Sequence, residues 1–153
     1  KFPEQKRVFS MIPGLENAEF LRYGVMHANT YLNSPKYLDE FFRVKGESNL
    51  YFAGQITGVE GYVESIFSGM MAGINMARNL EGKDLNPLPK ECITGALCKH
   101  VAGGSGSSSY QPMNANFGII TPLGKRIKDK KERYMEQSKR SVSILKENRG
   151  KYV

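Results

Sequence analysis

The sequence of 153 residues is 40% hydrophobic and 24% charged, with a formal net charge of +7, and this composition is typical of a globular domain large enough to bury a core. No apolar run approaches the ~18–20 residues that cross a bilayer, and the sequence contains no signal-peptide pattern, so we expect no contact with a membrane. Cys92 and Cys98 have neither the spacing of a C-x-x-C pair nor that of a zinc site, so we expect a reducing cytoplasmic location and no metal. Because the sequence begins at Lys1 rather than methionine, we expect a fragment of a longer protein.

The first third of the chain is predicted to contain a short helix followed by strands. Residues 3–9 favour a helix that ends before the Pro13-Gly14 pair. Residues 18–31 are rich in aromatic and β-branched residues, which predicts one or two strands. Residues 46–49 form a turn, and the apolar run at residues 50–53 is typical of a short buried strand.

A glycine-rich turn at residues 54–62 leads into the longest predicted apolar helix. Apolar residues recur there at the i, i+3, i+4, i+7 spacing of a buried helix face, and Gly82 is a suitable C-terminal stop. These apolar positions are Val63, Ile66, Phe67, Met70, Met71, Ile74, Ala77 and Leu80. Another face carries small residues that would let a second backbone approach closely, namely Ser65, Gly69, Ala72 and Gly73.

The remainder of the chain is predicted to contain two helices and two loops. Residues 91–101 favour a short helix, and residues 103–109 consist only of glycine and serine, as in a natural mobile loop or an engineered replacement for one. Residues 110–123 are too polar and turn-rich to form a strand throughout. Residues 125–148 favour a long charged helix with a narrow stripe of Ile127, Met135, Ser138, Val142 and Leu145.

The excess positive charge is confined to the C-terminal segment. From residue 125 onward the chain has 11 of its 22 basic residues but only four of its 15 acidic residues, so the preceding part is neutral. A basic segment on a neutral body predicts contact with a polyanion through neutralised phosphates and released counterions, although a solvated helix face would have the same composition. The densest cluster comprises Lys125, Arg126, Lys128, Lys130, Lys131 and Arg133.

The glycine-rich turn has the chemistry of a ligand site. A helix start offers unpaired N–H groups and a partial positive charge, and Gly54, Gly58 and Gly61 remove side chains where a flat ligand would approach the backbone. The spacing excludes both the GxGxxG fingerprint and a phosphate-binding loop. A comparable turn in flavoproteins with two dinucleotide folds holds a flavin, whereas a tight connection without a ligand is the alternative. On the flavin interpretation the cofactor-binding residues are Gly54, Gln55, Gly58, Val59, Glu60, Gly61 and Tyr62, with Gln55 at the ribityl chain.

Three blocks of sequence resemble the TrmFO family of folate- and FAD-dependent tRNA (uracil-5-)-methyltransferases. They are residues 7–33 (RVFSMIPGLENAEFLRYGVMHANTYLN), residues 52–65 (FAGQITGVEGYVES) and residues 111–122 (QPMNANFGIITP), in the same order and approximate spacing. The resemblance implies an α/β fold, namely part of an FAD-binding domain with two Rossmann halves and the end of an inserted α/β domain. It places the inserted domain at residues 1–31, the C-terminal part of the FAD-binding domain at residues 32–124 and a basic C-terminal helix at residues 125–153.

The resemblance also implies an activity. Enzymes of this family transfer a one-carbon unit from methylenetetrahydrofolate to uracil C5 in the T-loop of tRNA, with electrons from reduced FAD that NADH or NADPH regenerates. A paralogue that acts on ribosomal RNA, an MnmG-like (GidA) flavoprotein that modifies wobble uridine, and a non-catalytic RNA-binding module are the alternatives. The family's pyrophosphate-binding turn and its catalytic cysteines lie upstream of this chain. We therefore expect no catalytic residue here, an inactive chain on its own, and the missing N-terminal half as its partner.

The resemblance finally implies that one side of the flavin site binds the folate and the substrate. Its candidate residues are His27, Asn29, Thr30, Asn33, Gln111, Asn114 and Asn116. Their donors and acceptors suit the edge of a pterin, but such residues also cap strand ends and satisfy the backbone of their own loops.

Overall fold

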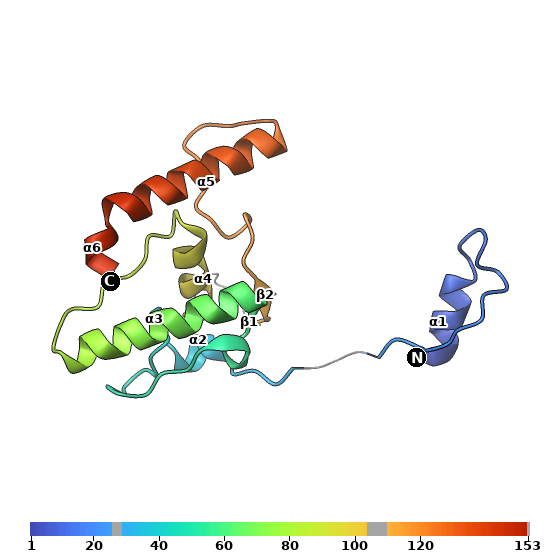
Figure 1. Cartoon of the computed structure of the whole chain (residues 1–153), viewed down its shortest axis with the longest axis horizontal. Coiled ribbons are helices and arrows are strands. Elements are labelled where there is room, and N and C mark those ends of the chain that lie inside the picture. The colour runs from blue at the N-terminus through green and yellow to red at the C-terminus, as the bar shows by residue number, and fades with distance from the viewer. Residues whose placement is uncertain (26–28, 104–109, 153) are drawn as a thin grey trace.

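The structure is a computed structural model that describes residues 1–25, 29–103 and 110–152 (Figure 1). Helices combine with a two-stranded parallel sheet, which confirms the α/β fold class. Two predicted features lie outside the described residues, namely His27 and residues 104–109 of the Gly/Ser segment. Within the described ranges, no helix is long and apolar enough to cross a membrane, and no three His, Cys, Asp or Glu side chains come together to hold a metal ion.

The N-terminal segment folds back on itself. Helix α1 spans Phe2–Phe9, as predicted, with a proline in its first turn where the missing N–H has no helical partner in any case. The side-chain amide of Gln5 donates to the carbonyl of Gly24 over 2.7 Å and accepts from its N–H over 2.9 Å. Figure 1 shows this segment apart from the other helices.

The prediction of one or two strands at residues 18–31 is wrong. The described part of that range, residues 18–25 and 29–31, contains no strand. The ring of Tyr23 stacks on Phe2 at 5.1 Å and on Phe20 at 5.3 Å between centroids. The aromatic residues therefore pack against α1 and against each other instead of alternating between the two faces of a sheet. The division of the chain at residues 31 and 124 stays a prediction.

The parallel sheet joins two blocks that are far apart in the sequence. Strand β1 (Val59–Glu60) pairs with β2 (Met113–Asn114), with Val59 opposite Met113 and Glu60 opposite Asn114. The strand predicted at residues 50–53 is reduced to an isolated antiparallel bridge between Tyr51 and Arg43. This segment is therefore not a buried strand.

Helices α3 and α4 enclose the core. Helix α3 spans Tyr62–Leu80 and is followed by Gly82 with a φ of +67°, so the predicted helix and its glycine stop are confirmed. Helix α4 spans Ile93–Val101, close to its predicted bounds. The short helix α2 (Ser34–Tyr37) and the 3₁₀ helix η1 (Gly54–Thr57) complete this part. The buried core residues are Leu38, Phe42, Val59, Met71, Ala72, Leu97, Cys98 and Val101.

The predicted buried face of α3 is wrong over much of its length. Val63, Ile66, Met70 and Leu80 are exposed, although their spacing is that of a buried stripe. The buried positions are Ser68, Met71, Ala72 and Asn75. The helix therefore packs on the core through its smaller and more polar side and presents apolar side chains outward.

Helix α5 spans Lys130–Glu147 and begins five residues later than predicted, because Asp129 caps it by accepting the N–H of Glu132 over 2.7 Å. The apolar stripe predicted for this helix is wrong, since Met135 and Val142 are exposed.

The C-terminal part of the chain is attached by polar contacts. Ser141 donates to the carbonyl of Glu91 over 2.9 Å and is buried together with Gln137. Arg140 donates to the carbonyls of Pro122 and Thr121. Helix α6 (Arg149–Tyr152) ends the described chain.

Candidate functional site

The glycine-rich turn is held against α3 by a serine. Gly54 has a φ of +73°, and its N–H donates to Oγ of Ser68 over 2.7 Å. Ser68 in turn donates to the carbonyl of Ser65 over 2.8 Å, and Thr57 donates to the carbonyl of Gly54 over 2.7 Å. The position of Gly54 is therefore fixed relative to the first turns of α3.

A second anchor holds the end of the turn. The carbonyl of Thr57 accepts from Oγ of Ser34 over 2.8 Å and from the hydroxyl of Tyr110 over 2.6 Å. Burial raises the pKa of Tyr110 from 10.0 to about 12, so its phenol stays protonated and can donate well into the alkaline range. Residues 29–33 reach the same turn, because the N–H of Leu32 donates to the carbonyl of Ile56 over 2.8 Å.

The three glycines differ in the space that they leave open. A side chain at Gly54 would meet nothing within 4 Å, whereas one at Gly58 would meet the ring of Tyr110 and one at Gly61 would meet the side chains of Glu64 and Asn114. The expectation that all three leave room for a ligand is therefore wrong for Gly58 and Gly61. All three have positive φ, so the shape of the turn itself requires glycine at these positions.

The start of α3 is accessible. No described side chain caps Gly61, the residue before the helix, and Tyr62 is 93% exposed. Gln55 is also exposed, Glu60 is half-buried, and the side chain of Val59 is fully buried. The unpaired N–H groups of this uncapped helix start can donate to a ligand with carbonyl acceptors, such as the pyrimidine edge of a flavin.

Glu64 connects this turn to the predicted folate and substrate block. Its Oε1 accepts the N–H of Ala115 over 3.2 Å, and the side chain of Asn114 lies beside Gly61. The structure therefore brings residues 54–62 together with residues 111–116, which the sequence separates by about fifty positions. The carboxylate also places negative charge at the start of α3, where it offsets part of the positive potential of the helix.

The amide side chains of the predicted folate side have different surroundings. Asn116 ties its own loop, because it accepts from the N–H of Gly118 over 2.9 Å and donates to the carbonyl of Asn114 over 3.1 Å. Gln111 is exposed, and its carbonyl lies 3.4 Å from Nε2 of His100. The remaining described candidates, which are Asn29, Thr30, Asn33 and Asn114, are exposed.

Comparison with known proteins places the chain in a family. Residues 1–84, more than half of the chain, match the family described as Glucose inhibited division protein A. The chain belongs to this family. The glycine-rich turn at residues 54–62 lies within the matched range. The resemblance that the three sequence blocks indicated is confirmed.

Three similar proteins are named methylenetetrahydrofolate–tRNA-(uracil-5-)-methyltransferase TrmFO. The relative from Acetivibrio thermocellus is 56% identical over 152 residues, which are 99% of this chain and 35% of the relative. Those from Staphylococcus carnosus and Streptococcus gordonii are 51% and 56% identical over 145 and 146 residues, which are 95% of this chain and 33% of each relative. The chain thus spans about a third of the length of these relatives.

The two cysteines of this GidA-family chain have the properties of core residues. Burial raises the pKa of the Cys98 thiol to about 12, and burial also raises the pKa of Cys92, with a smaller contribution from Glu91. The thiol of Cys92 donates to the carbonyl of Ser141 over 3.4 Å. Neither cysteine is a thiolate near neutral pH, so neither has the character of a nucleophile.

The predicted RNA-binding residues gather around the start of α5. Lys125, Arg126 and Lys128 lie in the segment before the helix, and Lys130, Lys131 and Arg133 lie in its first turn. A cavity of about 700 Å³ is lined by four of these six cations, namely Lys125, Arg126, Lys128 and Arg133. Phe117 and Tyr134 line it as well, with their rings stacked at 4.2 Å between centroids.

Several contacts of the site have no local signal in the sequence. The anchors Ser34, Ser68 and Tyr110 are ordinary residues within their segments, and Tyr110 meets Thr57 across 53 positions. The only sequence feature that connected Tyr110 with the site was its place directly before residues 111–122.

Proposed function

We propose that this chain is the C-terminal third of a flavoenzyme that methylates uracil C5 in the T-loop of tRNA. Methylenetetrahydrofolate would donate the carbon, and FAD, when bound, would supply the electrons that NADH or NADPH replenishes. The observation that carries this proposal is the identity of 51–56% over 95–99% of the chain to proteins named for that reaction.

In this proposal the turn at residues 54–62 holds one edge of the flavin. The open space at Gly54 and the uncapped start of α3 at Gly61 and Tyr62 support this assignment. The amides of α3 would donate to ring carbonyl groups, which stabilises negative charge on the reduced ring. Exposed Gln55 would contact the ribityl chain, whereas Gly58, Val59 and Glu60 would act by shaping the turn and pairing with β2.

The folate and substrate would approach from the side of residues 29–33 and 111–116. The hydrogen bond from Leu32 to Ile56 and that from Ala115 to Glu64 support this arrangement, because each brings one of these segments to the flavin turn. Asn29, Thr30 and Asn114 have exposed side chains that can donate to and accept from a pterin or a uracil. His27, Asn33, Gln111 and Asn116 belong to the same proposed side.

The basic residues at the start of α5 would bind the phosphates of the tRNA. Four cations around one cavity, with an aromatic pair in its wall, support this assignment. Positive charge of this kind gives affinity without reading sequence, so the choice of uracil would come from the flavin and folate side.

The chain would be inactive by itself and would work in the cytoplasm with the upstream two thirds of the enzyme. The test is a single polypeptide in which the upstream region of the Acetivibrio thermocellus relative is fused to this chain. We expect the fusion to purify with FAD and to form 5-methyluridine in tRNA when methylenetetrahydrofolate and a reduced nicotinamide are supplied. A fusion that folds and binds tRNA, but neither carries flavin nor methylates, would contradict the proposal.

A further inference from the structure

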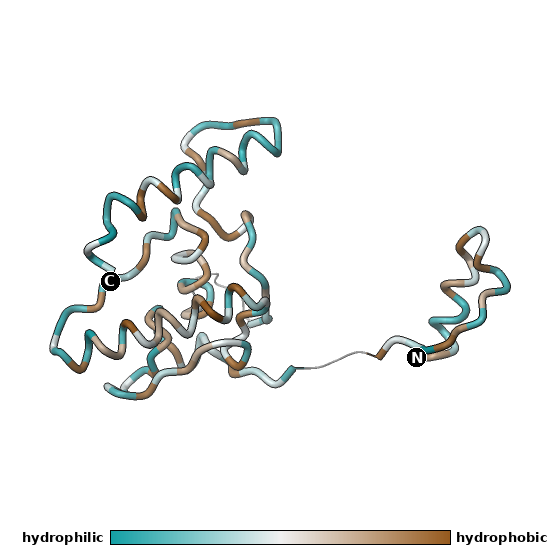
Figure 2. Tube along the Cα trace, viewed as in Figure 1, coloured by the Kyte–Doolittle hydropathy of each residue, from teal (hydrophilic) through white to brown (hydrophobic). Residues whose placement is uncertain are grey.

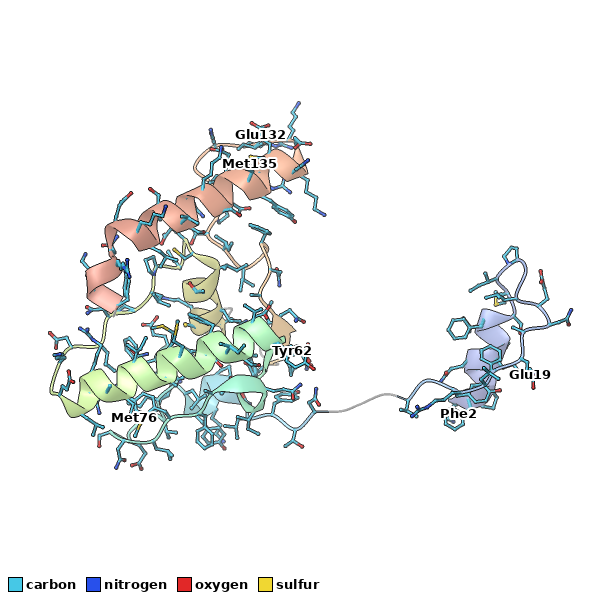
Figure 3. All side chains as sticks on the ribbon, in the orientation of Figure 1. Phe2, Glu19, Tyr62, Met76, Glu132 and Met135 are labelled. Carbon is cyan, nitrogen blue, oxygen red and sulfur yellow. The ribbon has the colours of Figure 1, made fainter. Side chains whose placement is uncertain are left out.

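One side of α3 is exposed and lacks charge over its whole length. We call it the α3 outer face, and it comprises Tyr62, Val63, Ile66, Gly69, Met70, Gly73, Met76, Ala77 and Leu80. Val63, Ile66 and Leu80 are 77%, 72% and 70% exposed, and Tyr62 provides the only polar group. Figure 3 shows the labelled Tyr62 and Met76 toward opposite ends of the helix.

The other long helix of the chain shows what a solvated face looks like. Most exposed residues of α5 are Lys, Glu or Ser, with Met135 and Val142 as its apolar exceptions. Figure 2 shows this contrast, since α5 is mainly hydrophilic and α3 carries hydrophobic residues along its length. Soluble proteins rarely leave a contiguous apolar surface of this extent uncovered, so the α3 outer face has the composition of an interface.

Two glycines lie on this exposed apolar face and not on a separate small-residue face as the sequence predicted, and they have no close neighbours among the described residues. A side chain at Gly69 or Gly73 would meet nothing within 4 Å, and neither residue has a positive φ. Glycine inside a helix costs about 1 kcal/mol relative to alanine, so its presence here needs a reason outside the chain. Gly69 and Gly73 lie one turn apart and make the centre of the face flat, which suits the close approach of another helix.

The length of the relatives indicates what covers the face. About two thirds of each relative has no counterpart in this chain, although 95–99% of the chain is matched. The face also begins at Tyr62, at the helix start that contacts the flavin in the proposed function. An element that packs along the face would therefore reach the same ligand.

We propose that the α3 outer face is the docking surface for a helix from the upstream region of the same enzyme, which crosses α3 at Gly69 and Gly73 through small and apolar residues. This inference rests on the proposed function only in taking the chain as part of that longer protein. The docking helix replaces solvent along the outer face and positions the upstream half against the start of α3.

Cysteine labelling tests the proposal on the fusion polypeptide described above. Ile66→Cys places a thiol at the centre of the face, and Met135→Cys places one on the exposed side of α5 as a control. Labelling is followed at each cysteine-containing peptide by mass spectrometry, so the other cysteines of the fusion do not interfere. We expect the residue-66 thiol to react at least about tenfold more slowly in the fusion than in the isolated chain, and the residue-135 thiol to react equally in both.

Gly73→Leu gives a second measurement. In the isolated chain the new side chain meets open space, so stability should be unchanged or higher because leucine is the better helix former. In the fusion it should speed labelling at residue 66 by about tenfold, because it forces the two helices apart. Gly150→Leu in α6, which also meets open space, should change neither labelling rate.

Equal labelling at residue 66 in both proteins would overturn the proposal. Slower labelling of the isolated chain at higher concentration would also overturn it, because the cover would then be a second copy. Flavin content is recorded separately, so protection without flavin would support docking while contradicting the proposed function.

Discussion

Replacement of Ser68 by alanine tests the anchor that fixes the glycine-rich turn at residues 54–62. In the folded chain Oγ of Ser68 is fully buried, accepts from the N–H of Gly54 over 2.7 Å and donates to Ser65 over 2.8 Å. Loss of the hydroxyl leaves the Gly54 N–H without its partner, which costs about 1–3 kcal/mol in the free energy of unfolding. Ser143→Ala is the matched control, because Ser143 is an exposed helical serine that donates to Glu147 over 2.7 Å.

Urea unfolding of the isolated chain measures the difference between the two variants. Both gain the same helix propensity, so the comparison isolates the buried hydrogen bonds. With a urea dependence of about 2 kcal/mol per M, a difference of about 2 kcal/mol moves the midpoint by about 1 M. We expect Ser68→Ala to unfold at the lower urea concentration by roughly that amount. Coincident midpoints for the two variants would refute the role given to Ser68.

Three further predictions follow from the geometry and charges. Gly58→Ala should lower the melting temperature more than Gly82→Ala, because both positions have positive φ but only Gly58 faces a ring in direct contact; equal melting temperatures would contradict this. A thiol reagent at pH 8 should label Cys98 only after the chain unfolds. The free energy of unfolding should fall as pH rises from 9.0 toward about 12, because the thiol of Cys98 ionises in that range in the unfolded chain but not in the folded chain. The double variant Lys125→Gln, Lys128→Gln should bind RNA more weakly. The slope of log affinity against log salt concentration should decrease by about 0.7–0.9 for each phosphate that is no longer neutralised. An unchanged slope would show that these two residues do not contact RNA.

The sequence predicted features that depend on local chemistry. The glycine-rich turn, the helix that follows it and its stop at Gly82 were all visible from residue type and spacing. The similarity to the relatives named TrmFO was carried by the same local blocks. Even so, the reason given for Gly58 was wrong, since the space beside it belongs to Tyr110, and only the folded chain brings these two residues together.

Features that depend on distant partners were not predictable. Phe20 and Tyr23 have strand propensity, but they stack in a segment that folds back on α1. Ile66 and Met70 follow the spacing of a buried face, yet both are exposed in the folded chain, because the described residues place no element over them. Periodicity identifies an apolar face of a helix, but it does not say which polypeptide segment packs on that face.

The most direct test concerns the start of α3 in the fusion polypeptide. Hydrogen exchange of the peptide that contains Gly61, Tyr62 and Val63 is measured with FAD bound and after its removal. Amides that hold the flavin edge should exchange more slowly with FAD bound, while those of the first turn of α5 keep their rate. Unchanged exchange at residues 61–63 in a fusion shown to contain stoichiometric FAD would contradict the assignment of this turn as the flavin contact.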